Sequence, residues 1–250
     1  MNILKLENIE KTFNGPKVLK GISLSVDEGE VVSVIGQSGS GKSTLLRCAT
    51  FLETIDSGTI SYMGRNAAWT ENGKICYEKD LSRFRRDFGL VFQNFNLFPH
   101  YSVLKNVTDA PISVLHADPA EAKDEAMALL EKMGLADRAG AYPCELSGGQ
   151  QQRVSIVRAL AMKPSMLFFD EPTSALDPQL TGEVLRVIRQ LADENMTMVI
   201  VTHEMPFARA VSDRVIFMNK GEIIEQGKPE DIFGDPQQEL TRQFLQSYQN

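Results

Sequence analysis

One glycine-rich segment carries the residue types that are best suited to bind a phosphate. It reads Gly36-Gln37-Ser38-Gly39-Ser40-Gly41-Lys42-Ser43 and fits the spacing G-x-x-x-x-G-K-[ST]. The glycines let successive backbone N–H groups turn inward around a phosphate, and a helix that starts here adds the positive end of its dipole. Lys42 would reach the β- and γ-phosphates of a nucleotide, and Ser43 would ligate Mg²⁺. We expect the whole segment, with Thr44 after it, to bind nucleotide phosphates.

A second chemical element is an apolar run that ends in two carboxylates, Asp170 and Glu171. Ligands of parallel sheets bind at the carboxyl ends of the strands, so a buried strand here would deliver Asp170 to the phosphate site. Asp170 is then a candidate partner of Mg²⁺ through water. Glu171 could act as general base on an attacking water molecule. Such a strand end could alone be a solvated turn, but together with the phosphate loop it predicts a hydrolytic site.

The elements around these residues alternate between strands and helices. Strands are predicted near 3–9, 22–26, 30–35, 59–62, 87–92, 166–170, 197–202, 214–218 and 222–225. Helices are predicted near 42–51, 104–115, 119–133, 150–162, 178–193, 204–211 and 237–248. This order predicts an α/β protein with a largely parallel sheet. Residues 94–162 read as consecutive helices, which indicates a helical insertion, and the polar stretch 63–80 is expected to form loop or short strands.

Composition and charge exclude several classes of protein. The chain has 250 residues, of which 42% are hydrophobic, and its net charge is −7, so it has no overall attraction for nucleic acid or anionic lipid. The longest apolar runs, 196–201 and 166–169, are far shorter than the roughly 20 residues of a membrane span. No signal peptide is recognisable, so we expect a cytosolic protein. The three cysteines and three histidines lack disulfide or metal-ligand spacing, and any metal is expected to be bound by oxygen.

A third motif is the point at which the sequence resembles a known family. The run Leu146-Ser147-Gly148-Gly149-Gln150, followed by Gln151-Gln152-Arg153, resembles the signature of the ATP-binding cassette (ABC) ATPases. The resemblance implies that Ser147, Gly148, Gly149 and Gln150 lie at a helix start and grip the γ-phosphate bound on the opposite subunit. Ser-Gly-Gly after Pro143 could be only a helix cap. The other motifs of the family, however, occur in the right order.

Those motifs extend along nearly the whole chain. Phe13 matches the aromatic residue that stacks on adenine, although it could also be a core residue of a strand. Gln93 matches the glutamine that contacts Mg²⁺ and links the core to the helical insertion. The run Ser174-Ala175-Leu176-Asp177 matches the loop through which two subunits communicate beside the nucleotide. His203 matches the switch histidine that senses the γ-phosphate, so Glu171, His203 and Gln93 are the expected catalytic residues.

The resemblance also implies an architecture. We expect an α/β P-loop NTPase (RecA-like) core with a mostly parallel sheet, a small N-terminal antiparallel β subdomain and an inserted α-helical subdomain. The chain would be one nucleotide-binding domain, 1–250. Residues 1–93 and 163–250 would form the ATP-binding core, and 94–162 the helical subdomain with the signature motif.

A finer resemblance is to the ABC ATPases of bacterial importers of polar amino acids. Three stretches carry it: 92–100, 146–153 and the C-terminal pair 235–238 and 240–245. It implies ATP and Mg²⁺ as ligands, a homodimer or a paired cassette subunit, and integral membrane permease subunits, with a solute-binding protein as an indirect partner and no nucleic acid. The chain would be peripheral, on the cytoplasmic face of the inner (plasma) membrane. The stretch 63–80 departs from this pattern.

Other interpretations are open at this point. An ABC ATPase of an exporter, a lipoprotein-release complex or a cell-division complex is the nearer alternative. A nucleic-acid machine built on the same cassette is disfavoured by the single cassette and the acidic charge. Phe95, Leu97, Phe98 and Tyr101 could anchor a helix of a membrane partner. They could equally form the core of the helical insertion.

Overall fold

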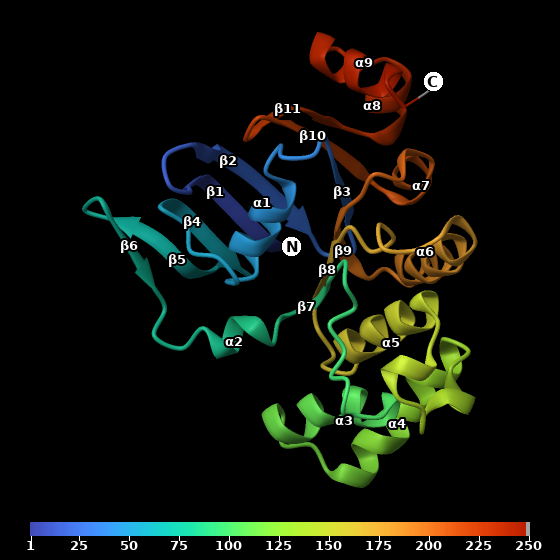
Figure 1. Ribbon diagram of the computed structural model, residues 1–250. Coiled ribbons are helices and arrows are strands. Elements are labelled where there is room, and N and C mark those ends of the chain that lie inside the picture. Colours follow the sequence, from blue (N-terminus) through green and yellow to red (C-terminus); the bar gives the residue numbers. More distant parts are fainter. Residues whose placement is uncertain (249–250) are drawn as a thin grey trace.

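The computed structural model describes residues 1–248 and contains two β-sheets (Figure 1). The first sheet has the antiparallel order β2-β1-β4-β5-β6, and the second has the order β11-β10-β3-β9-β8-β7. The strands of the first sheet are β1 (Asn2–Thr12), β2 (Lys17–Asp27), β4 (Ser57–Tyr62), β5 (Arg65–Glu71) and β6 (Lys74–Tyr77). Those of the second are β3 (Val31–Ile35), β7 (Phe88–Val91), β8 (Met166–Asp170), β9 (Thr197–Val201), β10 (Arg214–Asn219) and β11 (Glu222–Gly227).

The second sheet is parallel except at its β10–β11 edge. Every residue of β3, β8 and β9 is buried, which explains why these strands are mostly apolar and do not alternate between apolar and polar residues. The α/β fold class, with an antiparallel sheet near the N-terminus and helices inserted into a mostly parallel sheet, is confirmed.

The helices divide between the sheets and a separate lobe. The helices α3 (Val103–Val114), α4 (Pro119–Lys132) and α5 (Gly148–Leu160) form the lower lobe in Figure 1. The others are α1 (Lys42–Ala49), α2 (Ser82–Arg85), α6 (Pro178–Asp193), α7 (Met205–Val211), α8 (Pro229–Gly234) and α9 (Glu239–Gln246). Within residues 1–248, none of these helices has the length and apolarity that crossing a membrane requires.

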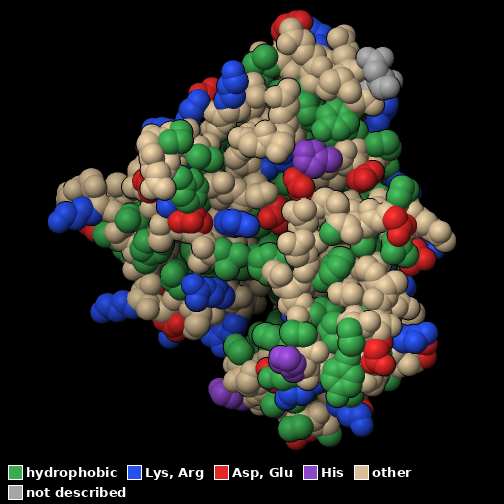
Figure 2. All heavy atoms as spheres, viewed as in Figure 1, with side chains coloured by type: hydrophobic (Ala, Val, Ile, Leu, Met, Phe, Trp, Pro, Cys, Tyr) green, Lys and Arg blue, Asp and Glu red, His purple; other side chains and the backbone are tan. Residues whose placement is uncertain are grey.

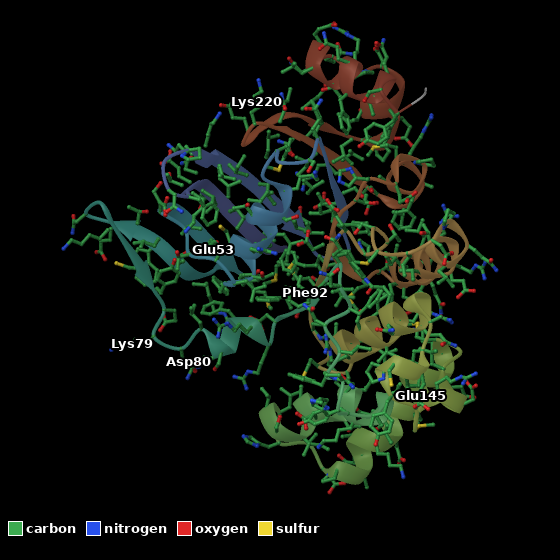
Figure 3. The ribbon with its side chains drawn as sticks, in the orientation of Figure 1. Glu53, Lys79, Asp80, Phe92, Glu145 and Lys220 are labelled. Carbon is green, nitrogen blue, oxygen red and sulfur yellow. The ribbon has the colours of Figure 1, made fainter. Side chains whose placement is uncertain are left out.

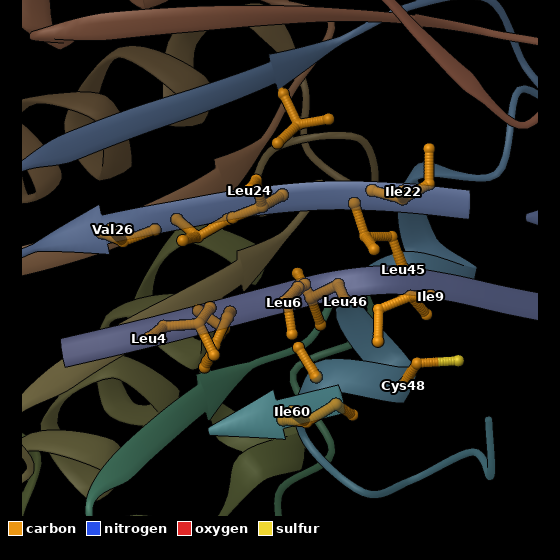
Figure 4. Packing of buried hydrophobic residues seen from close by; sticks show 14 of the residues in the cluster. Leu4, Leu6, Ile9, Ile22, Leu24, Val26, Leu45, Leu46, Cys48 and Ile60 are labelled. Atoms are coloured by element: carbon orange, nitrogen blue, oxygen red, sulfur yellow. The ribbon is translucent and has the colours of Figure 1, made fainter. Parts of the chain in front are cut away.

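Helix α1 is fixed between the two sheets by an apolar core. Figure 4 shows this packing, in which the labelled residues are Leu4, Leu6 and Ile9 of β1, Ile22, Leu24 and Val26 of β2, Leu45, Leu46 and Cys48 of α1, and Ile60 of β4. Burial raises the pKa of the Cys48 thiol to about 12, so this cysteine is a core residue without thiolate reactivity. The core therefore sets the position of the helix that follows the glycine-rich segment.

The stretch 63–80 contains the antiparallel strands β5 and β6, which are the short strands that the sequence left as one of two options. Their pattern was weak because only Ala67 and Ala68 of β5 are buried, and alanine has low strand preference. The short helices α2 and α8 were not predicted, since four and six residues are too few for a helical period to be visible.

Tyr62 offers a test of how α1 is held. Its ring is fully buried and stacks on Phe88 at 5.4 Å, and its hydroxyl donates to the carbonyl of Ala49, at the end of α1, at 2.8 Å. Tyr62→Phe should lower the free energy of unfolding by about 1 to 3 kcal/mol, because a buried carbonyl loses its partner. Urea unfolding measures this. Tyr142→Phe, at a side chain that is 47% exposed, is the control, and equal midpoints for the two variants would contradict the role of this bond.

Candidate functional site

The predicted chemical residues follow the carboxyl ends of neighbouring parallel strands. The phosphate loop follows β3, Asp170 ends β8, His203 comes just after β9, and Gln93 just after β7. Val91 of β7 pairs with Phe169 of β8, so Gln93 lies beyond the strand end adjacent to the two carboxylates. Because β3, β9, β8 and β7 run in the same direction, these residues meet at one edge of the sheet.

The phosphate loop is a tight turn that only glycine can form at two positions. Gly36 has a φ of 150°, and a Cβ there would lie 2.2 Å from the carbonyl oxygen of Met218. Gly41 has a φ of 102°, and a Cβ there would lie 3.0 Å from the carbonyl oxygen of Val18. The loop is thus pressed between β10 and the start of β2, while Gln37, Ser38 and Gly39 are exposed at its tip.

Lys42 and Ser40 are the buried polar groups of this loop. The Lys42 Nζ donates to the carbonyls of Gly36 and Gln37 at 2.9 and 3.0 Å, and burial lowers the pKa of Lys42 while Glu171 and Asp170 oppose that shift. The Ser40 Oγ is buried and has no hydrogen-bond partner within residues 1–248. A cation and an unpaired hydroxyl inside a glycine turn suit a phosphate group.

Ser43 and Asp170 join the loop to β8. The Ser43 Oγ donates to Asp170 Oδ1 at 2.7 Å, across 127 positions of sequence. Burial raises the pKa of Asp170, while the hydrogen bond from Ser43 opposes that shift. Within residues 1–248 no cluster of three His, Cys, Asp or Glu side chains could hold a metal ion. A hydroxyl and one carboxylate are nevertheless the hard oxygen ligands with which Mg²⁺ is bound beside phosphates.

Glu171 and His203 form a pair at the end of the same edge. The His203 Nε2 lies 2.9 Å from Glu171 Oε1, and this contact holds the pKa of Glu171 below its usual value, although burial opposes the shift. Glu171 has a left-handed φ of 48°, its N–H donates to the carbonyl of Val201, and its carbonyl accepts from Ser174 Oγ. A carboxylate fixed in this way can act as a base on water.

Phe13 lies in the turn between β1 and β2. Its side chain is 40% exposed, so it is not a core residue, and the Lys11 ammonium lies 5.0 Å from the centre of its ring. Asp56 accepts a hydrogen bond from the backbone N–H of Thr12 at 2.7 Å and fixes the turn. The strand that follows this turn, β2, contacts the phosphate loop, since a Cβ on Gly41 would lie 3.0 Å from the carbonyl oxygen of Val18.

The signature motif starts α5. Ser147 is the N-cap of this helix and exchanges hydrogen bonds with Gln150 in a capping box. A Cβ on Gly148 would lie 2.9 Å from Leu176 and 3.6 Å from Phe95, so the start of α5 is packed against the loop after β8 and the segment after Gln93.

The remaining predicted residue, Asp177, has a structural role in the helix that follows. Its carboxylate caps α6 by accepting from the N–H groups of Gln179 and Leu180, both at 3.0 Å. The Asp177 carboxylate is therefore hydrogen-bonded to the backbone of its own chain.

The start of α5 lies apart from the phosphate loop of its own chain. Figure 1 shows α5 in the lower lobe and α1, which begins at Lys42, in the upper part of the molecule. In Figure 3, Glu145, two residues before Ser147, lies in the lower lobe, and Phe92 lies at the junction of the two parts. One chain thus presents a phosphate loop and a signature motif at separate places.

The sequence analysis did not identify two residues that contact the predicted site segments. Arg158 of α5 donates to the carbonyls of Asn96 and Phe95 at 2.7 and 3.2 Å, and so ties the helical lobe to the segment after Gln93. The Tyr248 hydroxyl lies 3.2 Å from Nδ1 of His203. Neither residue stands in a motif, so only the spatial contact reveals it.

Comparisons with known proteins agree with this geometry. The family model of the ABC transporter matches residues 19–174. The chain is 50% identical, over 98% of both chains, to the arginine transport ATP-binding protein ArgV of Corynebacterium glutamicum. It is 52% identical to the glutamine transport ATP-binding protein GlnQ of Geobacillus stearothermophilus, over 97% of this chain and 98% of that one. A solved dimeric ATP-binding cassette in a post-hydrolysis state with ADP and Pi has a TM-score of 0.78 and 34% identity, over 90% of this chain and 98% of that one.

The geometry of the phosphate loop predicts the effect of a single methyl group. Gly36→Ala should weaken binding of a nucleoside triphosphate by about ten- to hundredfold. The added Cβ strains the backbone of the loop, which costs about 1 to 3 kcal/mol. Titration with a fluorescent nucleotide measures the affinity. Gly182→Ala in α6, where a Cβ meets nothing within 4 Å, is the matched control and should bind as the parent does. Equal affinities for the two variants would show that the loop does not enclose the phosphates.

Proposed function

Because the chain belongs to the ABC transporter family, we propose that it is the ATP-hydrolysing subunit of a membrane transporter that takes up polar amino acids. The observation that carries the ATPase is the edge of the sheet where Ser43 contacts Asp170 at 2.7 Å and Glu171 contacts His203 at 2.9 Å. The amino acid substrate class rests on relatives whose names specify arginine and glutamine transport and which match over nearly their whole length.

The phosphate groups of ATP fit the loop from Gly36 to Thr44. Lys42 supplies the one buried cation of the loop, and its ammonium would contact the β- and γ-phosphates. The orphan hydroxyl of Ser40 and the exposed backbone of Gln37, Ser38 and Gly39 would supply further donors. Phe13 presents an exposed ring for the adenine, with Lys11 beside that ring.

Mg²⁺ is the ion that this donor set fits. The Ser43 hydroxyl would bind it directly, Asp170 through water, and Gln93 from the adjacent strand end. When bound, Mg²⁺ would neutralise developing charge on the phosphates and orient them. The hydrogen bond between Ser43 and Asp170 keeps two of these oxygen ligands side by side.

Hydrolysis then needs a base and a sensor. Glu171 would accept the proton of the attacking water, and His203 would contact the γ-phosphate through the nitrogen that now faces Glu171. The hydrogen bond between Glu171 and His203 couples proton acceptance to sensing of the γ-phosphate. Glu171 Oε1 becomes free for water only when the imidazole of His203 turns to the γ-phosphate.

The signature motif would complete the site of a second copy. Ser147, Gly148, Gly149 and Gln150 start α5 away from the phosphate loop of their own chain (Figure 1). Free N–H groups at a helix start bind anions, so a head-to-tail dimer would place them on the γ-phosphate held by the partner. Asp177 and its loop, which packs on Gly148 through Leu176, would lie at the same interface.

Two parts of the chain would move relative to each other. We assign residues 1–93 and 163–250 to the ATP-binding core and 94–162 to the helical subdomain. Gln152 of α5 donates to the carbonyl of Phe92, and Arg158 of α5 donates to the carbonyls of Phe95 and Asn96. The segment around Gln93 would therefore move together with α5. Binding at Gln93 would thereby be transmitted to the helical subdomain.

A permease helix would dock beside this segment. Leu97 packs into the core of the helical lobe, whereas the Phe98 side chain is 53% exposed and contacts the Tyr101 ring at 5.2 Å. Figure 2 shows hydrophobic side chains beside the hollow between the two lobes. Exposed aromatic residues are good anchors for a helix of the membrane subunit.

Docking on a permease would also set where the chain is found in the cell and how it communicates with a solute-binding protein. The chain would bind peripherally to the permease at the cytoplasmic face of the inner membrane. An extracytoplasmic solute-binding protein would select the amino acid and reach this chain only through the permease. The relatives named for amino acid transport favour this assembly over that of an exporter or a lipoprotein-release or cell-division complex.

The base can be tested apart from binding. Glu171→Gln keeps the size of the side chain but removes the base, so ATP hydrolysis should fall by about 10²- to 10⁴-fold while ATP affinity is retained. The variant should accumulate as an ATP-dependent dimer, which size-exclusion chromatography with light scattering detects. Glu222→Gln, at an exposed glutamate of β11, is the control. A Glu171→Gln chain that hydrolyses ATP at the parental rate would contradict the assignment.

The signature motif can be tested in the same background. Adding Ser147→Arg to Glu171→Gln should abolish the ATP-dependent dimer, because the larger side chain fills the helix start that the partner's γ-phosphate must approach. ATP binding to the monomer should persist, since Ser147 lies outside its own phosphate loop. A dimer that survives the double substitution would show that Ser147 does not face a nucleotide.

Uptake tests the substrate class. A host in which this chain carries Lys42→Ala should lose uptake of at least one radiolabelled polar amino acid, because the lysine is needed for tight ATP binding. Uptake of a sugar measured in the same cells is the control. Unchanged uptake of every polar amino acid would contradict amino acid transport while leaving the ATPase unaffected.

A further inference from the structure

The turn just after α9 brings a phenol to the proposed switch histidine. The Tyr248 hydroxyl lies 3.2 Å from Nδ1 of His203, and Nε2 of the same ring lies 2.9 Å from Oε1 of Glu171. One imidazole thus stands between a phenol and the proposed general base. The two contacts come from segments 45 and 32 positions away in the sequence, so they are a product of the fold and not of a local turn.

Tyr248 is held in place by the docking of α9 on the second sheet. The Phe244 ring stacks on Phe217 of β10 at 4.8 Å, and the Tyr248 ring, one helical turn further, contacts Phe244 at 5.0 Å. Glu225 of β11 accepts hydrogen bonds from the N–H groups of Gln237 and Gln238 at 2.7 and 3.1 Å, just before α9. Figure 1 shows α9 above β10 and β11. The hydroxyl is therefore positioned by the sheet that also carries the phosphate loop.

With a neutral imidazole, the chemistry of the three groups gives both hydrogen bonds a direction. An ionised carboxylate only accepts, so the nitrogen that faces Glu171 must carry the proton. A neutral imidazole then has its lone pair on Nδ1, and this nitrogen needs a donor, which the Tyr248 hydroxyl supplies. Burial and the negative charge of Glu171 raise the pKa of Tyr248, so the phenol keeps the proton that it donates.

We propose that Tyr248 is a positioning residue that keeps the proton of His203 on Nε2, the nitrogen that faces Glu171 here and would turn to the γ-phosphate. The inference rests on the proposed function, in which this N–H senses the γ-phosphate. Without the phenol, the ring would be held by one hydrogen bond only and could rotate or exchange its tautomer. A smaller fraction of the chains would then present the N–H in the productive direction.

The ring nitrogens report the contact directly, in the absence of nucleotide. The sequence has three histidines, and His100 and His116 are exposed, so ¹⁵N-histidine labelling with a His203→Ala chain as reference assigns the signals. Spectra of the parent chain and of all variants are recorded at the same mildly alkaline pH. We expect a protonated Nε2 and an unprotonated, hydrogen-bonded Nδ1 in His203. Tyr248→Phe should move only this Nδ1 signal to the position of a free imine nitrogen.

Steady-state kinetics test the functional consequence. Tyr248→Phe keeps the ring contact with Phe244 and should lower kcat by about two- to tenfold, the effect of one hydrogen bond, with the KM for ATP within about twofold of the parent. In a His203→Ala background the same substitution should have no further effect. Tyr142→Phe, at a tyrosine that is 47% exposed against 46% for Tyr248, is the matched control and should leave the spectrum and kcat unchanged.

Several results would overturn the inference. A proton on Nδ1 in the parent chain, an Nδ1 signal that Tyr248→Phe does not move, or an equal loss of kcat in the His203→Ala background would each do so. An expected spectrum with an unchanged kcat would overturn the positioning role. Failure of the proposed function gives a different result: His203→Ala and Glu171→Gln would then hydrolyse ATP at the parental rate, while the nitrogen spectrum would still decide whether Tyr248 orients the ring.

Discussion

The parallel order of β3, β9, β8 and β7 is the constraint on which the proposed site depends. Parallel strands end at the same edge, so the phosphate loop, Asp170, His203 and Gln93 meet there although they are separated by up to about 170 positions in the sequence. The hydrogen bond between Ser43 and Asp170 depends directly on this strand order. Ser43 lies at the end of the loop that follows β3, and Asp170 is the last residue of β8. The antiparallel sheet and the apolar core around α1 fix the helix from which Lys42 and Ser43 project.

The position of the helical lobe explains why the proposed nucleotide site needs two copies of the chain. Its signature motif starts α5 in the lower lobe, whereas the phosphate loop starts α1 in the upper part of the molecule (Figure 1). The segment after Gln93 links these parts through the hydrogen bonds of Gln152 and Arg158. In the proposed assembly, a group bound at the sheet edge would therefore change the position of α5, and through it that of a permease, without direct contact between nucleotide and solute.

The sequence allowed the α/β class, the phosphate loop and the residues at the strand ends to be predicted, because each depends on a local pattern. The phosphate loop needs glycines at fixed spacing, and β8 needs an uninterrupted apolar run before Asp170. Residues that act through tertiary contacts could not be found in this way. Tyr248 belongs to no motif, and only the packing of Phe244 on Phe217 brings it to His203. The strands β5 and β6 were left open, because their few buried residues give little alternation.

The central claim is that each ATP is bound by the phosphate loop of one copy and the signature motif of the other. The most direct measurement mixes two inactive chains, one with Lys42→Ala and one with Ser147→Arg, and records ATP hydrolysis. In a mixed dimer, both defects fall in one composite site, and the other site has an intact Lys42 and an intact Ser147. Hydrolysis should therefore reappear on mixing, at a rate above that of either chain alone. If each site were formed within one chain, every site would contain a defect and the mixture would stay inactive, which would contradict the account.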